Sequence, residues 1–163
     1  MKKIKTTGIL LLLFFSALSV NGQNCTHYHI ENCRWAGRSF FYSRQSRSAS
    51  FLPGMTSTFR IVVYGGEEYY ISVDGHRKLG DLRLRIYDDS SDEKPLYDNA
   101  RFKYEEYFYF QNSRTRDLLL EVTSENPKVP EEERSGEKYC LGVLIEFKST
   151  SQAKDPFRDS VGF

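Results

Sequence analysis

Apolar and polar residues alternate with a period of two along much of this chain. The clearest example is the run DLRLRIYD, in which Leu82, Leu84 and Ile86 share one side while Arg83 and Arg85 share the other. Successive side chains of a β-strand point to opposite faces of the sheet, so this pattern predicts a strand that is half buried. We expect the leucine and isoleucine side chains to lie in a core and the two arginines to be exposed.

A second alternating stretch, residues 58–74, contains two runs separated by Gly65 and Gly66. Paired glycines supply the positive φ angles that a tight turn requires, so the stretch predicts a β-hairpin around which the other strands are arranged. The predicted core-facing residues are Phe59, Ile61 and Val63 in the first run and Tyr69, Ile71 and Val73 in the second.

Shorter runs of the same kind follow along the rest of the chain, and turn residues separate them. Short strands at regular spacing, without a convincing helix, indicate an all-β, antiparallel β-sandwich with jelly-roll or Greek-key connections. We expect one domain over residues 23–147, in which the runs at 107–111 and 117–123 pair with each other. The remaining predicted strands are residues 38–43, 48–52, 95–97 and 139–147.

The N-terminal residues 1–22 have the pattern of a signal peptide. Three lysines precede an uncharged apolar run at residues 8–20, which is too short to span a bilayer, and small residues follow it. We therefore expect a secreted or periplasmic protein without a transmembrane segment; a retained anchor is the alternative. Removal of 22 residues from 163 leaves 141, with 20 basic and 22 acidic side chains. Residues 148–163 are predicted to be a polar C-terminal tail.

The three cysteines predict one disulfide and one free thiol. Cys25 and Cys33 are eight residues apart, and a loop of that length is easily closed, so we expect them to form the bridge. Cys140 lies in the middle of a predicted strand and is expected to be a buried thiol. A Cys33–Cys140 bridge is the alternative pairing.

Three stretches, GGEEYYISVDG, LGDLRLRIYDD and EYFYFQ…RDLLLEV, resemble the bacterial pre-peptidase C-terminal domain. The resemblance covers about residues 51–122 and departs at residues 112–116, where that family has a glycine-tyrosine turn. It implies a secreted jelly-roll-like sandwich that is accessory and non-catalytic, attached to hydrolases and sometimes assisting substrate binding. The chain is also similar to small secreted bacterial proteins with QSRSA-F and GVLIE-type stretches, which implies no function.

The run YEEYFYF predicts a candidate ligand-binding surface. If Phe108 and Phe110 face the core, Tyr107 and Tyr109 face solvent on the same strand. Tyrosines can stack on sugar rings, and the arginines at positions 83 and 85 offer planar forks for carboxylate or phosphate groups. We predict that these four side chains form one surface, assuming that their strands share a sheet. The alternative is that the tyrosines cover the sheet while the arginines pair with neighbouring acids.

Charge is distributed unevenly. Residues 32–66 contain five arginines and no acid, whereas the later half of the chain is acidic. This indicates either a basic face for an anionic ligand or a solvated surface neutralised by the acidic half. Nucleic acid is not an expected partner, because the mature chain is not basic and lacks a nucleic-acid-binding motif.

One acidic loop, DDSSDE, offers a candidate metal site. Asp88, Asp89 and Asp92 are hard oxygen ligands of the kind that Ca²⁺ prefers. The loop lacks the spacing and the glycine of an EF-hand, so a solvated turn is the alternative. No other cofactor is expected.

The sequence lacks the motifs of the common enzyme classes: the GxSxG elbow, HExxH, the P-loop and the Rossmann glycine pattern are all absent. We therefore expect no enzymatic activity and favour a binding module for a glycan, an envelope component or a partner protein. A structural subunit of an envelope complex is the second hypothesis, and a small hydrolase the third. An exposed aromatic patch would favour the first, whereas a long unpaired apolar edge strand would favour the second.

Overall fold

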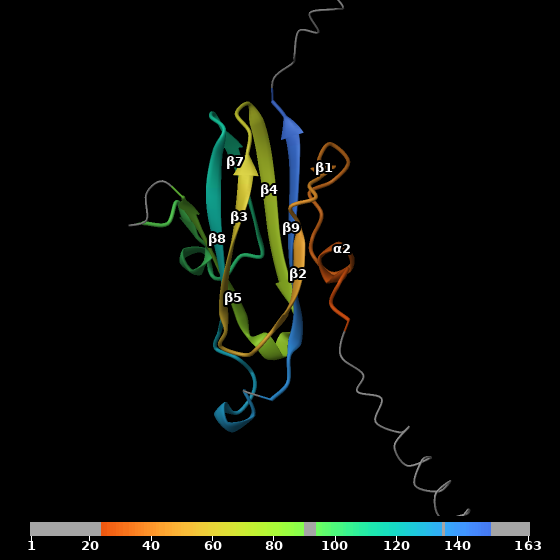
Figure 1. Cartoon of the computed structure of the whole chain (residues 1–163), viewed down its shortest axis with the longest axis vertical. Coiled ribbons are helices and arrows are strands. Elements are labelled where there is room, and N and C mark those ends of the chain that lie inside the picture. The colour runs from red at the N-terminus through yellow and green to blue at the C-terminus, as the bar shows by residue number, and fades with distance from the viewer. Residues whose placement is uncertain (1–23, 90–93, 135, 151–163) are drawn as a thin grey trace, which may run out of the picture.

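The computed structural model describes residues 24–89, 94–134 and 136–150 and shows two antiparallel β-sheets packed face to face (Figure 1). The chain is therefore an all-β sandwich, as the alternation predicts. The connections that cross from one sheet to the other are those of jelly-roll and Greek-key sandwiches. The predicted signal peptide and residues 151–163 of the predicted tail lie outside the described residues.

Sheet A is organised around its longest strand, β9 (Tyr139–Ser149). One side of β9 pairs with β4 (Glu67–Gly75), which in turn pairs with β7 (Tyr107–Asn112). The other side pairs with β1 (Phe41–Tyr42) and β2 (Arg47–Phe51).

Sheet B has the strand order β3-β8-β5-β6. Its strands are β3 (Thr56–Val63), β8 (Arg116–Glu125), β5 (Asp81–Asp88) and β6 (Tyr97–Asp98). The helical segments are short. Within the part of the chain that the structure describes, they are α2 (Tyr28–Glu31) and the 3₁₀ turns η1 (Arg77–Leu79), η2 (Asn99–Phe102) and η3 (Glu131–Glu133).

The core lies between the sheets and is built from the predicted apolar faces. Leu84 and Ile86 of β5 are buried against inward-facing residues of β4, β8 and β9, and Leu82 packs against the edge of the same cluster. Burying one such side chain contributes about 1.5–3 kcal/mol. The inward-facing residues of the other three strands are Tyr69, Ile71, Val73, Leu118, Leu120, Val122, Leu141, Val143 and Ile145.

The predicted hairpin at residues 58–74 is wrong, because β3 and β4 belong to different sheets. Gly65 and Gly66 carry the chain from sheet B to sheet A, and Gly66 takes a φ of 79°. A crossing connection places the apolar faces of two strands opposite each other across the core. The two strands that it joins therefore show the same alternation of apolar and polar residues as the two strands of a hairpin. The predicted pairing of residues 107–111 with 117–123 is wrong for the same reason.

Residues 24–40 fold over the outer face of sheet A, and we call this segment the flap. Its backbone packs on Gly142 so closely that an added Cβ there would lie 2.6 Å from His29 Cα. The Ser72 hydroxyl donates to the Arg34 carbonyl at 2.8 Å, and the Ala36 N–H donates to Glu146 Oε2 at 2.7 Å. Both faces of the central part of β9 are buried as a result.

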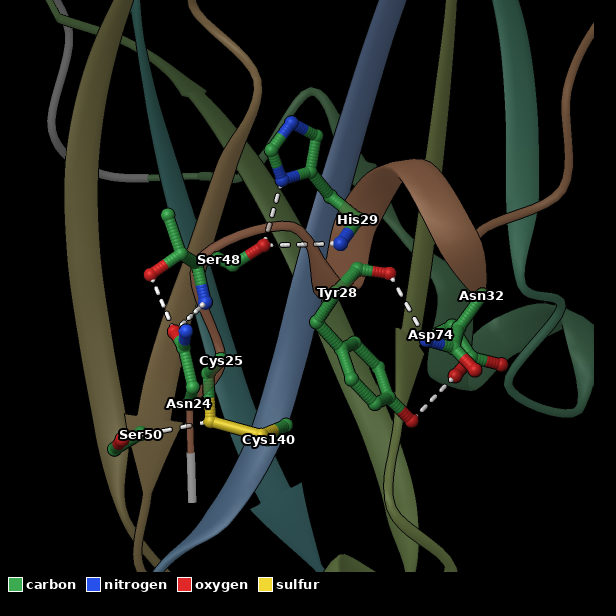
Figure 2. Close-up of a disulfide and its surroundings, with 10 residues drawn as sticks. Asn24, Cys25, Tyr28, His29, Asn32, Ser48, Ser50, Asp74 and Cys140 are labelled. Carbon is green, nitrogen blue, oxygen red and sulfur yellow. Dashed lines mark hydrogen bonds between the residues drawn. A yellow bond between two sulfur atoms is a disulfide. The ribbon is translucent and has the colours of Figure 1, made fainter. Parts of the chain in front are cut away.

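A disulfide between Cys25 and Cys140 attaches the flap to β9 (Figure 2). The predicted Cys25–Cys33 bridge is therefore wrong, as is the Cys33–Cys140 alternative. Tyr139 and Leu141 point into the core, so Cys140 between them points outward, toward the flap. Cys33 is a free, buried thiol, and burial raises its pKa to about 12. A disulfide that closes 115 residues belongs to an oxidising compartment, and the chain is secreted or periplasmic.

Candidate functional site

Four large apolar side chains of the flap and of the adjoining strand β1 are exposed to solvent. Phe41 contacts the Phe147 ring, and we call the other three the flap patch. They are Ile30, Trp35 and Tyr42, with 40%, 46% and 39% of their surface accessible. The Trp35 and Tyr42 rings lie 6.2 Å apart, and the Trp35 indole N–H donates to the Ile30 carbonyl at 3.1 Å. The patch is therefore contiguous and its polar atom is already satisfied.

A buried histidine holds Tyr42 in place beneath this patch. The Ser48 hydroxyl oxygen accepts the His29 backbone N–H at 2.9 Å, so its own hydrogen is available to His29 Nδ1 at 2.6 Å (Figure 2). With Ser48 as the donor to Nδ1, Nε2 carries the ring hydrogen and donates it to the Tyr42 hydroxyl at 3.0 Å. Burial lowers the pKa of His29, which favours this neutral form of the ring.

The neighbouring residue of α2, Tyr28, fixes the helix to sheet A by a further hydrogen bond. The Tyr28 hydroxyl donates to Asp74 Oδ1 on β4 at 3.0 Å (Figure 2). Together with the disulfide and the contact at Gly142, this bond holds the flap in a single position. A surface that is ordered before it binds loses less conformational entropy on binding.

The arginines of the acid-free stretch, residues 32–66, have two different environments. The Arg34 guanidinium lies over the Tyr107 ring at 4.4 Å, Arg47 lies over a phenylalanine ring, and Arg60 pairs with Asp89 at 2.9 Å. Arg38 and Arg44 are exposed and make no ion pair within the described part of the chain. Arg38 lies between Trp35 and Tyr42 in the sequence, and Arg44 lies two residues after Tyr42. These two cations favour an acidic partner.

The structure does not bring the four predicted ligand-binding residues together. Tyr107 and Tyr109 lie on β7 of sheet A, whereas Arg83 and Arg85 lie on β5 of sheet B, so the shared-sheet assumption is wrong. The two pairs occupy opposite outer faces of the sandwich. A role for either pair in binding stays a prediction.

The two tyrosines border the flap. Phe108 and Phe110 pack against the core, so Tyr107 and Tyr109 face outward as expected. Tyr109 is 46% exposed and its ring lies 5.9 Å from the Phe40 ring of the flap. Tyr109 thus extends the exposed aromatic surface of sheet A beyond the flap patch.

The two arginines are not freely exposed, which corrects the expectation from the alternation. Arg83 bonds Asp98 at 2.7 Å and Glu125 at 3.0 Å, and Arg85 pairs with Glu121. The bonds from Arg83 hold the pKa of Asp98 below its usual range. Both arginines thus neutralise acids of neighbouring strands, as the alternative interpretation held.

Two of the three predicted metal ligands interact with arginines instead. Asp88 is buried and lies 2.9 Å from Arg116, while Asp89 pairs with Arg60. Asp92 lies outside the described residues. Among the described residues, no three His, Cys, Asp or Glu side chains are grouped so that they could hold a metal ion. A calcium site that involves Asp92 stays a prediction.

Sequence reasoning did not identify the flap patch. The available signal was Trp35, the only tryptophan in the chain, which stands in the arginine-rich stretch. That the tryptophan is exposed follows from the path of the flap across sheet A, and no local pattern encodes that path.

None of the helices in the described part of the chain is long and apolar enough to cross a membrane.

No protein-family model and no curated protein matches the sequence. Among solved structures, the chain is similar to PliG of Aeromonas hydrophila, a periplasmic inhibitor of g-type lysozyme. The identity is 10% and the TM-score 0.46, over 71% of this chain and 93% of that chain. For PliG of Salmonella Typhimurium, also a periplasmic inhibitor of g-type lysozyme, the identity is 14% and the TM-score 0.38, over 63% and 89%. At these identities and TM-scores the likeness assigns no role to any residue of this chain.

Proposed function

We propose that this chain is a non-catalytic module that binds a partner protein through the flap patch. The observation that carries this proposal is the exposure of Trp35 between Ile30 and Tyr42, on a segment fixed by a disulfide. Tryptophan, tyrosine and arginine dominate the energetic centres of protein interfaces, and rigid aromatic rings lose little entropy on binding. The exposed Arg38 and Arg44 supply a basic rim.

The two edges of sheet B oppose assembly through the strands of that sheet. The amide of Gln45 covers the edge of β3 at Val62, because Nε2 donates to the Val62 carbonyl at 2.9 Å and Oε1 accepts the Val62 N–H at 2.7 Å. The opposite edge strand, β6, has only two residues. Covered and short edges oppose pairing with another chain.

The proposal is tested by comparing two double variants with the wild type. Trp35→Ala with Tyr42→Ala removes the aromatic part of the flap patch, while Leu96→Ala with Phe102→Ala removes two side chains that are more exposed but lie elsewhere. Each immobilised protein is exposed to secreted and periplasmic proteins of the source cells. Purified g-type lysozyme enters as a probe, because it is the named target of the two PliG proteins.

We expect the wild type and the Leu96/Phe102 variant to retain the same protein with similar affinity. The flap variant should bind it about 10- to 100-fold more weakly, since interface aromatics contribute about 2 kcal/mol or more each. All three should unfold cooperatively, with a lower denaturant midpoint for the flap variant because His29 Nε2 loses its Tyr42 partner. Equal retention by all three, retention of a glycan instead of a protein, or no retention by the wild type would contradict the proposed function.

A further inference from the structure

A second surface feature, an open cleft of about 570 Å³, lies at the end of β4 beside the flap. Tyr28 of α2 forms one wall, and Asp74 lies below it and accepts its hydroxyl hydrogen. The cations of the turn that follows β4 and of the loop that follows β8 line the rest. These cations are Arg77, Lys78 and Lys128, and His76 also lines the cleft.

The lysines and the arginine of this cleft are exposed and weakly neutralised. Lys78 lies 3.5 Å from Glu137, and about half of each side chain is exposed, so solvent strongly screens the pair. Arg77 and Lys128 make no ion pair within the described residues. Arg77 and Lys128 are therefore available to pair with a ligand. Lys78 can leave Glu137 and pair with a ligand carboxylate instead.

The backbone that carries these cations is rigidly anchored. Leu79 is fully buried, and the Lys128 N–H donates to the Lys78 carbonyl at 3.1 Å, so the two loops are joined. The His76 N–H donates to the Cys140 carbonyl at 2.9 Å, next to the disulfide. Gly80 has a φ of 77°, and an added Cβ would lie 2.3 Å from the Asn126 carbonyl oxygen. The backbone that carries the charged side chains is thus in place before any ligand arrives.

The arrangement of charge fits an extended acidic ligand better than a small anion. The cations belong to two separate segments and surround the cleft, whereas the Asp74 carboxyl group at its base disfavours a compact anion such as phosphate there. Tyr28 adds an aromatic wall, and the Tyr139 ring stacks on His76 at 4.9 Å. Nucleic acid fits poorly, because the mature chain carries more acidic than basic side chains.

We infer that this cleft binds an acidic peptide segment of the partner protein, whose carboxylates pair with Arg77, Lys78 and Lys128. The inference rests on the proposed function in that the ligand is taken to be a protein. Tyr28 of the cleft and Ile30 of the flap patch belong to the same short helix, α2. One partner seated on the flap patch can therefore also reach the cleft.

The test uses octaglutamate as the probe and measures amide NMR shifts of the whole mature chain. We expect shifts confined to residues 74–80 and 128, with an affinity that falls as salt is added. Arg77→Glu with Lys128→Glu should weaken binding about tenfold or more, because two attractions become repulsions. The matched control, Lys94→Glu with Arg101→Glu, makes the same charge change outside the cleft and should leave the affinity within about twofold.

Three outcomes would overturn the inference. These are no binding by the wild type, an equal loss in both double variants, and displacement of octaglutamate by equimolar inorganic phosphate or by a short DNA duplex. The flap variant Trp35→Ala with Tyr42→Ala separates this inference from the proposed function. It should bind octaglutamate as the wild type does even if the flap patch proves to have no partner.

Discussion

At the scale of single residues, Glu146 shows how the flap depends on a buried acid. Its side chain is 1% exposed and accepts one hydrogen bond, from the Ala36 N–H. Burial raises the pKa of this carboxyl group above its usual range, because the ionised form loses its hydration. Asp74, which accepts the Tyr28 hydroxyl, has a pKa raised for the same reason.

The raised pKa of Glu146 predicts a specific pH dependence of stability. A group whose pKa is higher in the folded than in the unfolded chain lowers the free energy of unfolding as pH rises through the interval between the two values. Glu146→Gln removes this loss while keeping an acceptor for Ala36. Relative to the wild type, the variant should therefore become more stable as pH rises above about 4, the usual pKa of a glutamate.

Denaturant midpoints of the two proteins, measured at several pH values, check this prediction. Acids such as Asp98, whose pKa is lowered by Arg83, oppose the trend in both proteins and cancel in the difference. Glu132→Gln, at an exposed position, serves as the control and should follow the wild type. Stability differences between the wild type and Glu146→Gln that do not change with pH would contradict the assigned role of Glu146.

At the scale of elements, the contact between the flap and β9 requires a residue without a side chain. Gly142 occurs where β9 passes beneath α2, and His29 backbone atoms occupy the space that a Cβ would need. Residues on both sides of Gly142 are buried, so the strand cannot move away without disturbing the core. A side chain added at Gly142 should therefore displace the flap and leave β9 in place.

Gly142→Ala is expected to displace the flap and to destabilise the chain by about 1–3 kcal/mol, the usual cost of overpacking. Trp35 is the only tryptophan, so its fluorescence reports directly on the flap, and its emission should shift in the variant. Binding of the partner should be lost as well. Gly136→Ala is the matched control, because an added Cβ there meets nothing nearer than 3.6 Å. Unchanged emission from Gly142→Ala would show that the flap does not depend on this contact.

At the scale of the whole molecule, one covalent bond joins the beginning of the fold to its last strand. Cys25 and Cys140 are 115 residues apart in sequence, with their Cα atoms 5.2 Å apart. Cross-linking residues this distant removes many conformations from the unfolded chain, which contributes about 5 kcal/mol in the entropic model. The disulfide therefore stabilises the entire sandwich as well as the flap.

Replacing both bridged cysteines, Cys25→Ala with Cys140→Ala, should lower the free energy of unfolding by about 2–5 kcal/mol. Non-reducing peptide mapping of the wild type should recover Cys25 linked to Cys140, and Cys33 should react with alkylating agents only after unfolding. Cys33→Ala should keep the bridge intact. A linked peptide that contains Cys33 would contradict this disulfide assignment.

The sequence by itself determined the strands, their buried faces and the fold class. Leu84 and Ile86 are buried because side-chain alternation is a property of each strand alone, and burial follows from it directly. The outward direction of Tyr107 and Tyr109 follows from the same rule. The compartment was predicted from the N-terminal pattern, and the disulfide supports it.

Only the tertiary structure decided which strands pair, which cysteines join and where the exposed aromatic side chains gather. A strand that leaves Gly65 and Gly66 for the opposite sheet has the same alternation as one that folds back in a hairpin. A loop of eight residues, as between Cys25 and Cys33, costs little conformational entropy to close. In the fold, however, α2 lies between the two cysteines and Cys25 faces β9. The physical reason is common to all three: partners are selected by contacts between residues distant in sequence, and local patterns carry no information about them.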